Sequence, residues 1–100
     1  TLAVPVKDTI KIADENGMVL STPDRSSLWA VQTPQVFEAG LYRRAMQLAR
    51  EQGKEYTDDC QLVEAAGNGV HLCMGSYSNL KLTTREDLPA AEAFLKGRDL

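Results

Sequence analysis

The sequence predicts an α/β layered fold with a β-hairpin that leaves its sheet. Short β-like runs alternate along the chain with segments of helical periodicity, in the order strand, hairpin, helix, helix, strand, strand, helix. This alternation is typical of layered α/β proteins. Asn16-Gly17 lies between two alternating apolar runs, which is the strongest short-range signal for a hairpin. The composition agrees, because 43% apolar and 25% charged residues are ordinary values for a folded domain.

Charge and cysteine content exclude several classes of protein. The net charge of −3 argues against a protein that coats nucleic acid. No apolar run is long enough to span a bilayer and no signal-peptide pattern is present, so we expect no membrane partner. Cys60 and Cys73 lack metal-ligand spacing, and we expect both to be buried thiols in a reducing compartment, with no metal site.

The chain opens on a predicted strand over residues 1–6. No initiator methionine precedes it, so we expect a fragment of a longer protein. The hairpin follows over residues 9–21 and places Ile10 and Ile12 on one face of its first strand. Because an isolated hairpin is marginal in water, these side chains and Val19 need a covering surface. That surface is either the core of this chain or a second copy.

The stretch from Asp24 to Gln35 combines a cation, the only tryptophan and a Thr-Pro-Gln turn. Arg25 can hold a phosphate with its planar fork, and Thr33 beside a proline has a fixed backbone, so the stretch predicts an anion site. On the residues alone, a solvated arginine, a core tryptophan and a plain turn are the more common arrangement.

Two helices are predicted next. Leu41, Ala45 and Leu48 recur at helical spacing, and Gly53 can supply a left-handed cap. The second helix begins at Thr57-Asp58-Asp59, where we expect Thr57 to be the N-cap and the two acids to serve the helix dipole rather than a metal.

The last elements are strands at residues 70–74 and 80–82 and a final helix capped by Thr84. Lys81 stands at a strand end near a helix start, where α/β folds commonly place ligands, although a solvated edge lysine fits equally well. Pro89 predicts a kink or a late helix start. His71 is expected to be structural. The predicted buried stripe of the helix is Leu88, Ala91, Phe94 and Leu95.

Five motifs in series resemble the C-terminal part of the 2-C-methyl-D-erythritol 4-phosphate cytidylyltransferase family. In order they are Pro5-Val6-Lys7-Asp8-Thr9-Ile10-Lys11, Asp24-Arg25 with Leu28-Trp29, Gln32-Thr33-Pro34-Gln35, Thr57-Asp58-Asp59, and Asn79-Leu80-Lys81-Leu82-Thr83-Thr84-Arg85-Glu86-Asp87-Leu88. The resemblance implies part of a Rossmann-like nucleotidyltransferase sheet with a protruding β-hairpin dimerisation arm. Residues 1–37 would be the strand, the arm and the substrate-binding turn. Residues 38–100 would be the C-terminal helices and strands of the same domain, with the N-terminal nucleotide-binding half absent.

The resemblance also implies an activity. The family transfers CMP from CTP to the methylerythritol phosphate and releases pyrophosphate, in non-mevalonate isoprenoid biosynthesis. Thr9, Thr33 and Thr57 would contact the alcohol phosphate, Arg25 would reach its phosphate from the partner of a homodimer, and Lys81 would neutralise the phosphates during transfer. Arg25 and Lys81 are thus the catalytic candidates. Mg²⁺ is expected, with its ligand in the missing half, so this fragment alone would be inactive. The expected location is the cytoplasm, or the plastid stroma in a plant.

Two alternatives stay open. A pentitol phosphate enzyme, for example one acting on ribitol 5-phosphate, would share the fold and the arm. Leu28-Trp29 and Asn79-Leu80-Lys81 favour methylerythritol phosphate. The hairpin could also belong to a non-catalytic dimerisation module.

Overall fold

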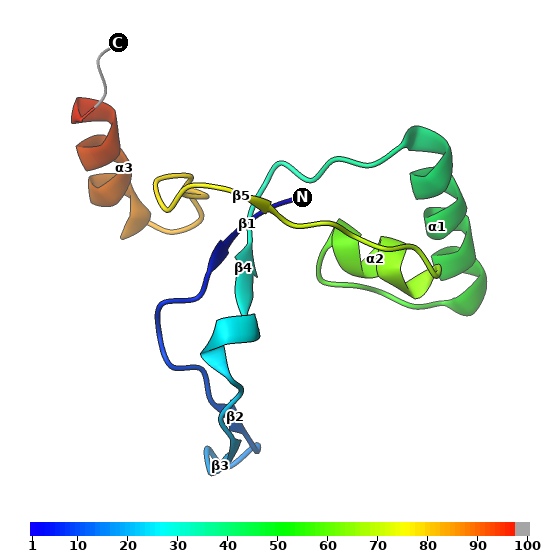
Figure 1. The fold of residues 1–100 in the computed structure, drawn as a ribbon, viewed down its shortest axis with the longest axis horizontal. Coiled ribbons are helices and arrows are strands. Elements are labelled where there is room, and N and C mark those ends of the chain that lie inside the picture. Colours follow the sequence, from blue (N-terminus) through cyan, green and yellow to red (C-terminus); the bar gives the residue numbers. More distant parts are fainter. Residues whose placement is uncertain (98–100) are drawn as a thin grey trace.

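A three-stranded mixed sheet lies at the centre of this computed structural model, which describes residues 1–97. Strand β1 (Leu2–Pro5) is the middle strand. It pairs antiparallel with β4 (Trp29–Val31) and parallel with β5 (Cys73–Met74) (Figure 1). The two connections thus bring segments far apart in sequence to the two edges of one short strand. The last three positions of the predicted 38–100 segment lie outside the described residues.

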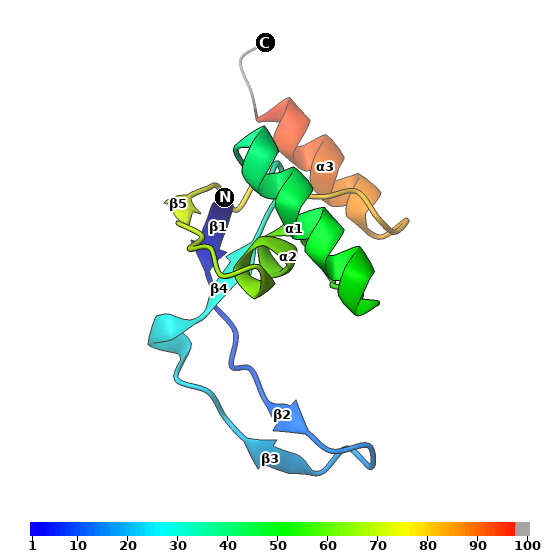
Figure 2. The same cartoon turned by 90° about the vertical axis from the view of Figure 1, so that its right-hand side faces the viewer.

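The predicted hairpin is present as β2 (Ile12–Ala13) and β3 (Val19–Ser21). Its turn is held by Asp14, whose Oδ1 accepts hydrogen bonds of 2.9 Å from the backbone N–H groups of Asn16 and Met18. Gly17 has a φ of 81°, a conformation that glycine adopts without steric cost. The hairpin extends away from the sheet and from all three helices in both views (Figures 1 and 2).

The return from the hairpin differs from the prediction. A 3₁₀ turn at Arg25–Ser27 leads into β4, a strand that sequence periodicity did not indicate. The Trp29 side chain is 38% exposed on this strand, so the expectation of a core tryptophan is wrong for this chain. β4 is only three residues long, and all three residues, Trp29, Ala30 and Val31, are apolar, so no alternation of apolar and polar side chains marks it in the sequence.

Helices α1 (Ala39–Gln52) and α2 (Asp59–Ala65) pack against each other on one side of the sheet, and α3 (Asp87–Lys96) lies on the other (Figure 1). Gly53 ends α1 with a φ of 63°, which confirms the predicted left-handed cap. No helix within residues 1–97 is both long enough and apolar enough to cross a bilayer.

Both predicted N-caps are wrong by one or more residues. Asp58, not Thr57, caps α2, because its Oδ1 accepts a hydrogen bond of 2.8 Å from the backbone N–H of Gln61. At α3, Asp87 Oδ2 accepts from the backbone N–H groups of Thr83 and Thr84 at 3.0 and 3.1 Å. The helix itself begins at Asp87, with Glu86 and not Thr84 at the N-cap position, which agrees with the late start that Pro89 predicted.

The predicted strands near the C-terminal end are shorter than expected. Only Cys73 and Met74 of residues 70–74 join the sheet, and residues 80–82 form no strand. The Gly75 N–H still donates to the carbonyl oxygen of Ala3, but beyond it the chain turns back on itself, with backbone bonds from Asn79 to Ser76 and from Leu80 to Ser78. Cys60 is buried as predicted, whereas Cys73 is exposed, which corrects the expectation for that thiol.

The core is small and consists of two contacting parts. Ala3 and Val4 are buried in β1, and four small side chains are buried between α1 and α2, namely Ala45, Ala49, Cys60 and Val63. The Cys60 thiol joins the two parts by donating to Thr1 Oγ1 at 3.1 Å. The radius of gyration is 16.9 Å, against about 13 Å for a compact domain of this length.

The predicted buried stripe of α3 is not buried. Leu88 and Leu95 are 51% and 55% exposed, and Phe94 is 39% exposed. The reason is that α3 projects away from the sheet and the other helices in Figure 1, so its apolar side faces no other described element. The apolar spacing predicts the helix correctly, but nothing within residues 1–97 covers its apolar side.

Candidate functional site

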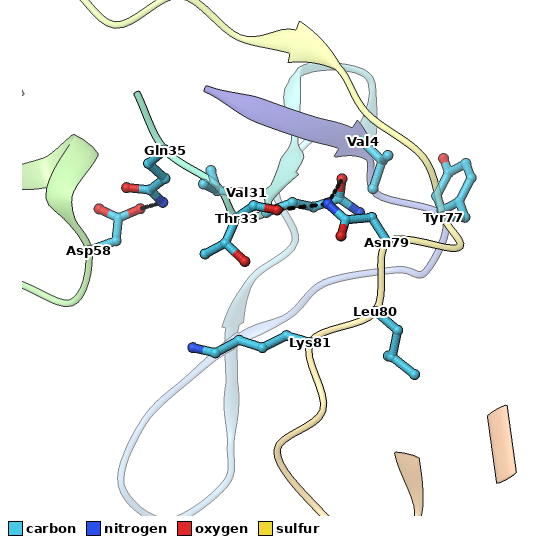
Figure 3. A pocket seen from close by; sticks show the side chains of 10 residues that line it. Val4, Val31, Thr33, Gln35, Asp58, Tyr77, Asn79, Leu80 and Lys81 are labelled. Atoms are coloured by element: carbon cyan, nitrogen blue, oxygen red, sulfur yellow. Dashed lines mark hydrogen bonds between the residues drawn. The ribbon is translucent and has the colours of Figure 1, made fainter. Parts of the chain in front are cut away.

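A cavity of about 420 Å³ opens at the edge of the sheet where β4 ends and the loop after β5 passes (Figure 3). Apolar and polar side chains both line it. Its lining residues are Val4, Val31, Gln32, Thr33, Gln35, Asp58, Tyr77, Asn79, Leu80 and Lys81. They come from β1, β4 and its following turn, the start of α2, and the segment between β5 and α3.

One wall is the turn after β4. Thr33 is joined to Pro34 by a cis peptide bond, and Gln35 follows at once. The Gln35 side chain reaches the start of α2, where its Oε1 accepts from the backbone N–H of Cys60 at 3.2 Å and its Nε2 lies 3.4 Å from Asp58 Oδ2. The turn and α2 are therefore fastened together beside the cavity.

The other wall belongs to the loop from Gly75 to Lys81, of which Tyr77, Asn79, Leu80 and Lys81 line the cavity. Gln32 Nε2 donates to the backbone carbonyl oxygen of Ser76 at 2.8 Å, and Asn79 Nδ2 donates to that of Thr33 at 2.8 Å. Lys81 follows two residues later, and Figure 3 shows its side chain extended below Thr33, toward the side on which Asp58 lies. Of the ten lining residues, Lys81 is the one cation.

The base of the hairpin touches the same loop. The Tyr77 hydroxyl donates to the backbone carbonyl oxygen of Pro5 at 2.7 Å, and Lys7 Nζ lies 4.2 Å from the centre of the Tyr77 ring. Arg25 Nη1 donates to the backbone carbonyl oxygen of Lys7 at 2.6 Å. Arg25 thus lies at the hairpin base and does not line the cavity of its own chain.

The structure unites two of the five predicted site residues. Thr33 and Lys81 line one cavity, although they lie on separate segments. Thr57 is outside the lining but precedes Asp58, which belongs to it; its hydroxyl donates to Gln61 Oε1 at 3.1 Å. Thr9 and Arg25 belong to the hairpin and its return and are exposed, so their contribution to a site stays a prediction.

The acid in the cavity is already engaged. Asp58 caps α2 with one carboxylate oxygen and receives Gln35 with the other, so the helix N-terminus balances its charge. At the hairpin return, the backbone N–H of Ser26 lowers the pKa of the Asp24 carboxyl, next to Arg25. The cavity can therefore present the positive charge of Lys81 and the hydroxyl of Thr33 to an anion.

The residues present do not fit a Mg²⁺ site by themselves. Residues 1–97 contain no group of three His, Cys, Asp or Glu side chains placed to hold a metal ion. Mg²⁺ requires several oxygen ligands in near-octahedral geometry, and Asp58 is the one carboxylate of the cavity lining. The described residues of this chain therefore do not make up a metal site by themselves.

Sequence reasoning missed the side-chain amides that join the two walls. Gln32 and Asn79 each open one of the family motifs, but the sequence alone predicts no contact for either side chain. The available signal was the loop Ser76-Tyr77-Ser78-Asn79, since asparagine at the end of such a polar loop commonly bonds to backbone groups. Tyr77 was missed because its contact with Pro5 spans distant parts of the sequence.

Comparisons with known proteins agree with one another. The model of the family "IspD: 2-C-methyl-D-erythritol 4-phosphate cytidylyltransferase" matches residues 1–97. The 2-C-methyl-D-erythritol 4-phosphate cytidylyltransferase of Desulforamulus reducens is 58% identical over 98 residues, which are 98% of this chain and 42% of the relative. That of Caldanaerobacter subterraneus is 56% identical over 95% of this chain and 42% of its own length.

Solved structures give the same result for the fold. The crystal structure of the enzyme of that name from Thermus thermophilus superposes with a TM-score of 0.80 at 38% identity, over 94% of this chain and 46% of that one. The 4-diphosphocytidyl-2C-methyl-D-erythritol synthase structure from Anaerococcus prevotii has a TM-score of 0.83 at 37% identity, over 95% and 44%. The chain thus spans about two-fifths of its relatives' length. That this share is the C-terminal part, as the sequence predicted, is not confirmed by these matches.

Proposed function

The chain belongs to the IspD family of 2-C-methyl-D-erythritol 4-phosphate cytidylyltransferases, and from this premise we propose that it contributes the alcohol-phosphate site of such an enzyme. The complete enzyme would transfer CMP from CTP to 2-C-methyl-D-erythritol 4-phosphate and release pyrophosphate. The relatives that carry this enzyme name and the membership of residues 1–97 in the family support the proposal.

The observation that carries the proposal is the convergence of Thr33 and Lys81 on one cavity. Its volume of about 420 Å³ falls within the roughly 300–1,000 Å³ of small-molecule sites. A hydroxyl donor and an ammonium group are the chemistry that a phosphate monoester needs. The apolar side chains of Val4 and Val31, which also line the cavity, would contact the carbon chain of the alcohol.

The reaction requires positioning more than covalent chemistry. A phosphate oxygen of the substrate would attack the α-phosphorus of CTP in line, a new P–O bond would form, and the bond to the β-phosphate would break as pyrophosphate leaves with the electron pair. Negative charge spreads over the nonbridging oxygens during the transfer. Lys81 would stabilise this charge, and Thr33 would hold the attacking phosphate in place.

The hairpin completes the proposal as a dimer contact. Ile12 and Val19 are each 50% exposed on it, and Leu20 is 65% exposed. A two-stranded hairpin is marginal in water without a covering surface, so a second copy would both stabilise it and be stabilised by it. In such a homodimer, Thr9 and Arg25 would reach the cavity of the partner, where Arg25 would bind the substrate phosphate.

The enzyme would act in the cytoplasm or, in a plant, in the plastid stroma.

The test uses the complete protein that contains this chain. We expect it to form the CDP-alcohol and pyrophosphate from CTP and 2-C-methyl-D-erythritol 4-phosphate, with a higher kcat/KM than for ribitol 5-phosphate assayed in parallel. Lys81→Ala should lower kcat/KM by about a hundredfold or more, in line with the loss of one charge-stabilising donor. Lys54→Ala, a change of an exposed lysine just after α1, is the matched control and should leave kcat/KM unchanged. Undiminished turnover by Lys81→Ala, or a preference for ribitol 5-phosphate, would contradict the proposal.

A further inference from the structure

Two side-chain amides connect the turn that carries Thr33 to the loop that precedes Lys81. Gln32 Nε2 donates to the backbone carbonyl oxygen of Ser76 at 2.8 Å, so it spans from the end of β4 to the start of the loop. Asn79 Nδ2 donates back to the carbonyl oxygen of Thr33 at 2.8 Å and also lies 3.4 Å from Gln32 Oε1. We call Gln32 and Asn79 the amide pair. Figure 3 draws the bonds of the Asn79 amide as dashed lines beside the turn that carries Thr33.

The packing around Gly75 leaves room for the amide of Gln32. A Cβ atom built on Gly75 would overlap Gln32 Oε1, so any larger residue there would displace this amide. The backbone N–H of Gly75 itself donates to the carbonyl oxygen of Ala3 at 2.9 Å, which fixes the start of the loop to β1. The loop is therefore anchored at its start by the sheet, in its middle by the hydrogen bond from the Tyr77 hydroxyl to the Pro5 carbonyl oxygen, and nearest to Lys81 by the amide pair.

Beyond these contacts, little holds Lys81 in place. Residues 75–86 contain no helix or strand, and the loop has only two short-range backbone bonds, from Asn79 to Ser76 at 3.0 Å and from Leu80 to Ser78 at 2.9 Å. Lys81 lies two residues after Asn79, and its backbone joins no ladder with the sheet. The position of its ammonium group relative to Thr33 therefore depends on the bond between Asn79 and the Thr33 carbonyl oxygen.

From this geometry we infer that the amide pair positions Lys81 opposite Thr33 for the transfer step, with Asn79 as the principal positioning residue. The inference rests on the proposed function, because it assigns Lys81 a role in the reaction. An amide suits this position because its two N–H groups can donate to both the Thr33 carbonyl oxygen and Gln32 Oε1. An aspartate at position 79 could donate to neither group, because an ionised carboxylate only accepts hydrogen bonds and both partners are acceptors too. Asn79 contacts no substrate in this scheme and acts through Lys81.

A double-mutant cycle in the complete protein tests the inference. Asn79→Ala, Lys81→Ala and the double variant are assayed with CTP and the alcohol phosphate, using radiolabelled CTP so that low rates are measurable. We expect Asn79→Ala to lower kcat by about ten- to a hundredfold, since a small misplacement of a catalytic group has this effect. KM for the alcohol phosphate should change by less than about threefold. In the Lys81→Ala background, Asn79→Ala should lower kcat no further, because there is no ammonium group left to position.

A glycine variant tests the same contact without removing either amide. Gly75→Ala should displace the Gln32 side chain and lower kcat several-fold, again with no further loss in the Lys81→Ala background. Gly69→Ala is the matched control, because a Cβ atom there meets nothing within 4 Å, and it should keep wild-type kcat. This pair keeps the inference testable if Asn79→Ala fails to fold.

The outcomes separate the inference from the proposed function. If Lys81→Ala is strongly impaired but the losses from Asn79→Ala and Gly75→Ala multiply with it, or if kcat is unchanged in both, the inference is overturned and the proposed function stands. If Lys81→Ala itself has wild-type kcat, both are overturned. A loss in KM alone, with kcat intact, would also overturn the inference, because it would assign Asn79 to substrate binding.

Discussion

Gln35 Oε1 accepts a hydrogen bond of 3.2 Å from the backbone N–H of Cys60, although 25 positions separate the two residues. Cys60 lies in the first turn of α2, where a backbone N–H group has no partner within the helix. The same side-chain amide reaches Asp58, the N-cap of that helix. The turn beside the cavity and the start of α2 therefore share their hydrogen-bonding groups, and each helps to place the other.

Replacement of Gln35 by alanine should destabilise the protein. The part-buried N–H of Cys60 would lose its side-chain partner, which costs about 1–2 kcal/mol of unfolding free energy. Urea denaturation measures this value. Gln47→Ala is the control, because Gln47 is exposed on α1 and makes one hydrogen bond, of 3.4 Å, to Glu51, so its cost should stay within about 0.5 kcal/mol. Equal effects of the two changes would show that the Gln35 contact is not structural.

Substitutions at Asp58 and at Thr57 should affect different properties, the first stability and the second substrate binding. Asp58→Ala removes the N-cap of α2 and should cost about 1 kcal/mol of unfolding free energy. Thr57 is exposed and is not the cap, so Thr57→Ala should cost clearly less. If Thr57 contacts the alcohol phosphate, as the family resemblance implies, its change should instead raise KM for that substrate. Thermal unfolding together with steady-state kinetics distinguishes the two. A larger stability loss for Thr57→Ala than for Asp58→Ala would contradict the capping geometry.

The hairpin should be required for dimerisation. A charge at Val19, which is exposed in one copy, would be buried in the proposed interface, and an unpaired buried charge is strongly unfavourable. Val19→Asp should therefore shift the complete protein from dimer to monomer, as measured by light scattering at micromolar concentration. Glu15→Ala, in the exposed turn of the hairpin, is the control. A Val19→Asp protein that remains dimeric would show that this face is not the interface.

Two inactive variants should restore activity when mixed. If Arg25 acts on the partner's site, a heterodimer of Arg25→Ala and Lys81→Ala subunits contains one intact site. Random exchange makes half of all dimers heterodimers, so roughly a quarter of wild-type activity should return. Subunits are mixed, incubated to exchange and assayed. If Arg25 and Lys81 of one chain served the same site, no mixture would recover activity.

The start of α3 should weaken at low pH. Hydrogen bonds from the backbone N–H groups of Thr83 and Thr84 lower the pKa of the Asp87 carboxyl below its usual value of 3.8. A lowered pKa means that the ionised form is favoured in the folded state. Its stabilisation is therefore present above pH 3.8 and is lost as the pH falls through the lower, folded-state pKa.

Thermal unfolding between pH 6 and pH 2.5 checks this prediction. The wild type should lose more stability over the acid end of this range than Asp87→Asn, which has no charge to lose. Asp8→Asn, a change of an exposed carboxylate near the hairpin base, serves as the control and should follow the wild type. Parallel curves for the wild type and Asp87→Asn would contradict the assigned hydrogen bonds.

Local sequence signals determined the elements whose causes are local. The hairpin depended on Asn16-Gly17, and the end of α1 depended on Gly53, because positive φ angles are accessible to glycine wherever it stands in the fold. The apolar spacing of Leu41, Ala45 and Leu48 was sufficient for α1 for a similar reason. The family resemblance was also carried by short motifs, and the comparisons confirm it.

Pairing and burial were decided only by the tertiary structure. β4 forms along one edge of β1, whereas residues 80–82, predicted as a strand, join no sheet. Asp58 and not Thr57 caps α2, because in the folded chain it is the Asp58 carboxylate that accepts the hydrogen bond from the backbone N–H of Gln61. The sequence alone determined which residues could hold a phosphate, since that depends on their chemistry. Only the folded chain decided that Thr33 and Lys81 share a cavity, because hydrogen bonds between distant segments, from Gln32 and Asn79, bring them together.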